Sequence, residues 1–137
     1  MVLIVCSYIY KQNNKIDKLF MFEDIPREKL QNAISSFAHT LSADETVIFL
    51  YDDTIRGSSK QGILLTTKYL YCESDVVSIP NINKMEIKYG KVTAKIVIDM
   101  QTRSDMIVHI AQMKKPAESL FNLLNEAVHL LKKEWEK

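Results

Sequence analysis

Apolar and polar side chains alternate along most of the middle of the chain. In residues 84–90, for example, Met85, Ile87 and Tyr89 alternate with polar neighbours. Period-two alternation sorts side chains onto the two faces of a strand, so it predicts half-buried β-strands separated by short turns. The seven predicted strands cover residues 46–52, 62–67, 69–74, 76–80, 84–90, 91–99 and 105–112.

Two other stretches have apolar side chains at spacings of three and four residues, which is typical of one buried face on an α-helix. The first covers residues 26–40, and the second runs from Pro116 to beyond Trp135. Proline is favourable at the first helical position, and both Pro26 and Pro116 fit that place. The second stripe is the longer, and it predicts that Leu124 is buried near the middle of the helix.

The first residues form the apolar run VLIVCSYIY at positions 2–10, which is too short to span a bilayer and lacks the features of a signal peptide. Its valines, isoleucines and tyrosines favour a buried strand. The next apolar segment, residues 16–25, fits either a second strand or an irregular packed segment. A strand that is apolar on both faces is expected to be covered on both sides.

This strand therefore predicts a homodimer or a stable complex with another protein, unless it folds back entirely within its own chain. The side chains expected at that interface are Val2, Ile4, Tyr8 and Tyr10.

The order of these elements predicts an α+β fold. About seven antiparallel strands would form a nearly closed β-barrel, and the C-terminal helix would plug its open end. Residues 1–41 would be an N-terminal extension of one strand and one helix, and residues 42–137 would be the barrel with its capping helix. The length of 137 residues suits one compact core.

The segment from residue 45 to residue 134 resembles the bacterial pleckstrin-homology-like (PH-like) and GRAM-like domains. The resemblance lies in a glycine-bearing turn, a strand pair of the form G-x-x-x-T-x-x-x-[IL]-Y, and a following apolar segment. The matching positions are Gly62, Thr66, Leu70, Tyr71, Val77, Ile79 and Ile82. The resemblance implies a PH-like barrel and supplies no reaction.

The loop IRGSSKQG, residues 55–62, has two glycines at the spacing of a phosphate-binding Walker A loop. Ile63 and Leu64 stand where that motif needs lysine and serine or threonine, and a strand follows instead of a helix. PH-like domains that bind phosphoinositides do so at this loop, so it remains a candidate anion site. Its candidate residues are Arg56, Ser58, Ser59 and Lys60. The alternative is a solvated turn in which Gly57 takes a positive φ and the nearby Asp52 and Asp53 offset the cations.

The net charge of +1 gives no general attraction to nucleic acid, and no nucleic-acid partner is expected. The hairpin lysines Lys84, Lys88, Lys91 and Lys95 are interpreted as a solvated face. Cys6 and Cys72 are expected to be reduced core thiols. No metal-ligand spacing or catalytic motif is present, so neither a cofactor nor an enzyme activity is expected.

The sequence therefore predicts a non-catalytic PH-like interaction module in the bacterial cytoplasm. Its partner would be another protein or a second copy of itself. The alternative is a peripheral module that binds an anionic lipid headgroup or phosphate through the glycine–serine loop.

Overall fold

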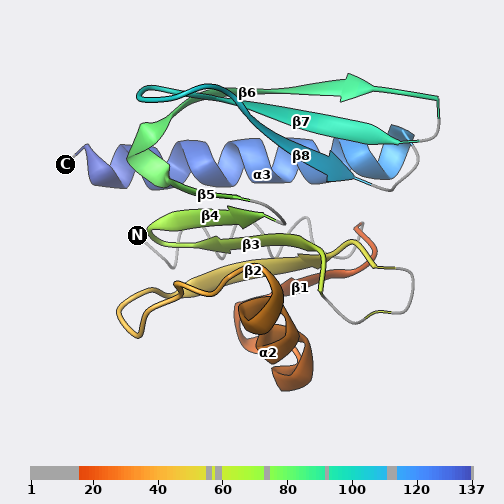
Figure 1. Cartoon of the computed structure of the whole chain (residues 1–137), viewed down its shortest axis with the longest axis vertical. Helices are drawn as coiled ribbons and strands as arrows, with labels where there is room; N and C mark the ends of the chain where they lie inside the picture. Colours follow the sequence, from red (N-terminus) through yellow and green to blue (C-terminus); the bar gives the residue numbers. More distant parts are fainter. Residues whose placement is uncertain are drawn as a thin grey trace.

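The computed structural model describes residues 16–54, 57, 60–72, 75–91, 93–110 and 114–136. In this part of the chain the fold is α+β. Eight strands form two antiparallel sheets, and a long C-terminal helix packs against them (Figure 1).

The first sheet has five strands in the order β1-β2-β3-β4-β5, so each strand pairs with its neighbours along the chain. The strands are β1 (Leu19–Met21), β2 (Val47–Asp52), β3 (Gly62–Thr66), β4 (Tyr69–Cys72) and β5 (Asp75–Ser78). Neighbouring strands are antiparallel throughout. The connections from β3 to β4 and from β4 to β5 are short, as antiparallel hairpins allow.

Local chemistry explains two of these connections. The Thr66 hydroxyl accepts the backbone N–H groups of Lys68 and Tyr69, at 3.1 and 3.0 Å, and this closes the tight turn between β3 and β4. At the start of β3, Gly62 has φ +151°, and an added Cβ would lie 1.9 Å from the Tyr51 carbonyl oxygen. Only glycine fits this position, because any side chain would separate β2 from β3.

The second sheet has three strands, β6 (Ile82–Tyr89), β7 (Ala94–Met100) and β8 (Met106–Ile110), in that order. A short 3₁₀ helix, η2 (Ile79–Asn81), leads from β5 into β6. Along β7 and β8 buried and more exposed residues alternate strictly, as the sequence pattern predicts.

The C-terminal helix α3 (Lys114–Trp135) buries its apolar stripe between the sheets. Leu120, Leu124 and Leu131 are at most 1% exposed, and they share one core cluster with side chains from all eight strands. In Figure 1 the helix runs along the junction of the two sheets.

The other face of the five-stranded sheet is covered by the helix α2 (Arg27–Ser36), which follows the 3₁₀ turn η1 (Phe22–Asp24). A second apolar cluster forms there, where Ala33, Phe37 and Ala38 meet Leu50, Leu64 and Tyr71 of the sheet. Every residue of β3 is therefore buried, and its apolar run GILLT does not alternate.

The prediction of a nearly closed barrel is wrong for the described residues, in which no strand pairing joins the two sheets. The physical reason lies at η2, where the chain leaves the ladder and Pro80 has no N–H to donate. An ion pair of Arg103, in the loop after β7, with Asp75 of β5 crosses between the sheets there.

The bounds of the predicted elements differ in detail. The first predicted helix ends at Ser36 instead of residue 40, and the ambiguous segment 16–25 contains both β1 and η1. The predicted strand at residues 2–10 lies outside the described residues. No helix in the described part of the chain is long and apolar enough to cross a membrane.

Leu124 has no exposed surface in the middle of α3. We expect Leu124→Ala to lower the free energy of unfolding by about 2–5 kcal/mol, because it removes buried methyl groups and leaves a cavity. Urea unfolding measures the loss. The control is Asn122→Ala on the exposed side of the same helix, which should change stability by no more than about 0.5 kcal/mol. Equal midpoints for the two variants would contradict the assigned face.

Candidate functional site

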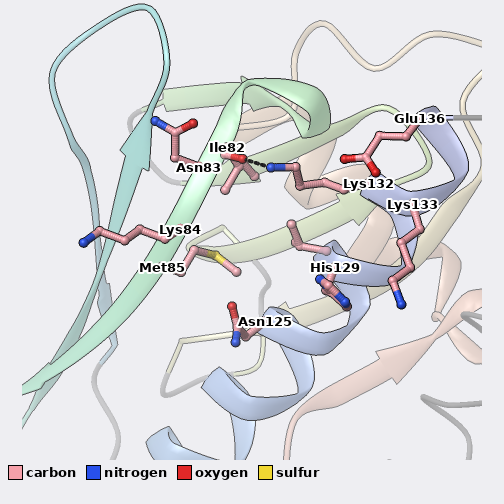
Figure 2. Close-up of a pocket in the computed structure, with 10 residues that line it drawn as sticks. Ile82, Asn83, Lys84, Met85, Asn125, His129, Lys132, Lys133 and Glu136 are labelled. Carbon is pink, nitrogen blue, oxygen red and sulfur yellow. Dashed lines mark hydrogen bonds between the residues drawn. The ribbon is translucent and has the colours of Figure 1, made fainter.

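A hollow of about 320 Å³ lies between the first half of β6 and the C-terminal half of α3 (Figure 2). We call it the β6–α3 groove. The strand contributes Ile82, Asn83, Lys84 and Met85 to its lining, and the helical side contributes Asn125, Val128, His129, Lys132, Lys133 and Glu136. Met85 and Val128 supply buried apolar surface, while the other helical side chains supply polar and charged groups.

One wall of the groove is the edge of a sheet. Among the described strands, β6 pairs only with β7. The hairpin turn is closed by the Gly90 N–H, which donates to the Thr93 carbonyl at 2.8 Å. Along an antiparallel pair, residues that bond to the partner strand alternate with residues that do not. Counted from Gly90, the backbone N–H and C=O groups of Met85 and Ile87 therefore point away from β7. The open edge of β6 therefore presents backbone donors and acceptors beside the groove.

The helical wall is moderately basic. Lys132 donates through its Nζ to the Ile82 carbonyl oxygen, so it covers the first acceptor of the edge (Figure 2). Lys133 and His129 lie on the same wall, and Glu136 is its acidic member. The Lys84 side chain points away from the helix in Figure 2 and adds no charge there. Exposed backbone groups, an apolar floor and a basic wall make a surface suited to binding a peptide.

The loop that the sequence proposes as an anion site leads from β2 to β3. Of its candidate residues, Arg56, Ser58 and Ser59 lie outside the described residues, and Lys60 is exposed. Gly57 has φ +74°, so the predicted positive φ is confirmed. The structure thus places Lys60 at the surface and does not describe how it lies relative to the other three.

A feature missed in the sequence lies beside this loop. Asp52 is fully buried at the end of β2, where it accepts hydrogen bonds from Lys29 at 2.9 Å and from the Thr54 N–H and hydroxyl at 3.0 and 2.5 Å. Burial by itself would raise the pKa of Asp52, but the hydrogen bonds from Thr54 and Lys29 outweigh it and lower the pKa. Lys29 also donates to the Gly57 carbonyl, so α2 holds this loop in place.

A second buried carboxylate follows α2. Glu45 accepts hydrogen bonds from the Tyr71 hydroxyl at 2.8 and 2.9 Å, from Thr66 at 2.7 Å and from the Ser42 N–H at 2.9 Å. Burial, followed by the hydrogen bond to Glu45, raises the pKa of Tyr71. Because each group in this cluster has a protein partner, we interpret the cluster as a fixed support for the loop between α2 and β2.

The remaining sequence-based candidates are dispersed. Cys72 is buried, as predicted, whereas Cys6 and the predicted interface residues Val2, Ile4, Tyr8 and Tyr10 lie outside the described residues. In the described part of the chain, no three His, Cys, Asp or Glu side chains gather as a metal site would need.

No protein-family model matches this chain, and no curated protein matches it in sequence.

Removing the cation beside Asp52 should destabilise the protein in a pH-dependent way. Lys29→Met should lower the free energy of unfolding by about 1–3 kcal/mol near pH 7, because the buried carboxylate loses a partner. The lowered folded-state pKa of Asp52 contributes stability that is present above its unfolded pKa of about 3.9 and is lost as the pH falls. The difference between variant and parent should therefore shrink below about pH 4.

Unfolding in urea at a series of pH values measures this effect. Lys84→Met, which removes an exposed lysine paired with Glu86 at 3.5 Å, is the matched control and should cost at most about 0.5 kcal/mol. A loss from Lys29→Met that stayed constant from pH 7 to pH 3 would show that Asp52 is not the group it stabilises.

If the β2–β3 loop is only a turn, the double change Arg56→Ala and Lys60→Ala should leave stability within about 0.5 kcal/mol of the parent. Binding to liposomes that contain phosphatidylserine or a phosphoinositide should stay near zero for both proteins. Co-sedimentation at two salt concentrations measures it. Salt-sensitive binding by the parent that disappears in the double variant would assign the loop to anionic lipid instead.

Proposed function

We propose that this protein is a non-catalytic, PH-like interaction module of a bacterial cytoplasmic protein, and that it binds an extended segment of a partner protein in the β6–α3 groove. The observation that carries the proposal is the open edge of β6 beside a groove whose second wall is a helix. An exposed strand edge is a ready template for another strand.

The PH-like part of the proposal is supported by the order of the elements. Seven antiparallel strands, β2 to β8, precede a helix that packs against both sheets. The residues that carry the resemblance are also consistent with it, because all seven are buried in the structure. They are Gly62, Thr66, Leu70, Tyr71, Val77, Ile79 and Ile82.

An added strand would lie about 4.8 Å from β6 and bond to the backbone of Met85 and Ile87. Alternate side chains of that strand would then point toward the helical wall, where Val128 offers apolar contact. Lys133 and His129 favour an acidic side chain at the rim. The bond of Lys132 to the Ile82 carbonyl would limit the added strand to the part of the edge after Ile82.

The test starts from random decapeptides displayed on phage and selected against the whole protein. With a selected peptide bound, amide hydrogen exchange should slow at Met85 and Ile87. The amides of Glu86 and Lys88 are the internal control, because they already face β7 and should change little. Selection of no peptide, or a slowing that falls on other elements, would contradict the proposal.

A charge change tests the helical wall separately. Lys133→Glu should weaken the binding of a selected acidic peptide by roughly fivefold, because an exposed ion pair contributes at most about 1 kcal/mol. Lys91→Glu makes the same change at an exposed position outside the groove lining and should leave the affinity unchanged.

The second candidate function is binding of an anionic headgroup or phosphate at the β2–β3 loop. One observation favours it, since Lys18 donates to the Thr54 carbonyl at 2.7 Å and Lys29 donates to that of Gly57, which brings two more cations to the loop. Lys29 is already matched by the buried Asp52, so this candidate ranks below the groove.

A further inference from the structure

The outer face of the three-stranded sheet is organised in rows that run across the strands. The register of the strands places Lys88 opposite Lys95, and Lys95 opposite His109. Side chains two residues further along each strand share this face, so Glu86, Val97 and Ile107 form the middle row. The third row consists of Lys84, Asp99 and Asp105.

The first row gathers two lysines and a histidine on neighbouring strands. Within the described residues, Lys88, Lys95 and His109 take part in no ion pair or hydrogen bond between side chains. Like charges directly opposite each other on neighbouring strands are destabilising. Their arrangement therefore calls for an acidic group from outside this part of the chain.

The opposite end of the same face is acidic. Asp99 accepts only a long hydrogen bond from Asn83, at 3.4 Å, and Asp105 has no such partner in the described residues. Lys84 is matched by Glu86 of its own strand at 3.5 Å. Between the two ends, Ile107 is 44% exposed beside Val97, and a hollow of about 290 Å³ lies over the face.

We infer that this face is self-complementary and that its partner is a second copy of the same chain. A two-fold axis that runs across the strands, at the level of the middle row, would place the basic row of each copy over the acidic row of the other. Lys95 then meets Asp99 of the second copy, and His109 meets its Asp105. At the axis Ile107 packs against its own counterpart. On β6 like charges meet, because Lys88 lies over Lys84 of the second copy and Glu86 over its own counterpart. The pairing of Lys84 with Glu86 within each copy, at 3.5 Å, limits this repulsion.

The size of the face sets the strength of the association. Three strands about 4.8 Å apart present a narrow surface, well below the roughly 800 Å² per partner that stable complexes bury. The dimer is therefore weak, with a dissociation constant on the order of 100 µM, and its ion pairs make it sensitive to salt.

Sedimentation equilibrium of the whole protein from about 10 µM to 1 mM at low salt tests the inference. The parent should shift from the mass of a monomer toward that of a dimer. Lys95→Glu and Asp99→Lys should each weaken the association by about tenfold, since each pair occurs twice in the dimer. The protein that carries both changes should recover the parental constant to within about threefold, because the charges then match again.

Two further variants complete the design. Ile107→Asp should abolish association, because it replaces the apolar contact at the axis with a second pair of facing carboxylates beside that of Glu86. Lys91→Glu, at the exposed hairpin turn, should have no effect and is the control. All these positions are partly or fully exposed, and urea unfolding checks that each variant folds. If either single variant of the first pair is unstable, His109→Glu and Asp105→Lys provide a second exchange of charges.

A parent that remains a monomer at 1 mM overturns the inference. So does a dimer that is indifferent to Ile107→Asp, since it would use another surface. Failure of both charge exchanges to restore association would overturn the two-fold arrangement. None of these results bears on peptide binding at the β6–α3 groove, which is measured at the strand edge.

Discussion

The apolar stripe of α3 is the contact on which the rest of the fold depends. The two sheets share no strand pairing within the described residues, so side-chain packing has to join them. Leu120, Leu124 and Leu131 do this, because they lie in one cluster with residues of both sheets. A polar contact also joins the end of the helix to the first sheet, because Trp135 Nε1 donates to the Thr67 carbonyl at 3.2 Å. Because the helix fills the junction, the two sheets hold together without the strand pairing that a closed barrel would have.

This packing determines which surfaces remain open for a partner. In the described part of the chain, α2 covers one face of the five-stranded sheet, and α3 with the second sheet covers the other. Among the described residues, the second sheet is covered on its inner face only. Its outer face and the edge of β6 are thus exposed, and the basic and acidic rows lie on that face. The groove and the self-complementary face both follow from this difference: in the described structure the first sheet is covered on both faces and the second on one.

Much of the secondary structure could be predicted, because it depends on local patterns. The alternation in residues 84–99 and the stripe around Leu124 are periodic signals, and the two strands β6 and β7 and the helix α3 are present there. The separation into two sheets could not be predicted, since it depends on how one proline-containing turn directs the chain between β5 and β6. The ion pair of the buried Asp52 with the partly buried Lys29 joins residues 23 positions apart. In the sequence, Asp52 stands before a loop, where an acidic residue is usually solvated. Its burial depends on where α2 packs.

The groove was missed for a similar reason, because Met85 and His129 are distant in sequence and neither carries a motif. The charges of the chain nevertheless follow one rule in the described structure. Where a carboxylate is buried, as at Asp52 and Glu45, the fold supplies donors from several elements. Lys88, Lys95 and His109 are instead left together without such partners, although a single acidic substitution among them would relieve the repulsion. The fold gives its buried carboxylates several donors but leaves this basic row on an exposed sheet without acidic partners in the described residues. A partner's charges explain such a row better than chance spacing does.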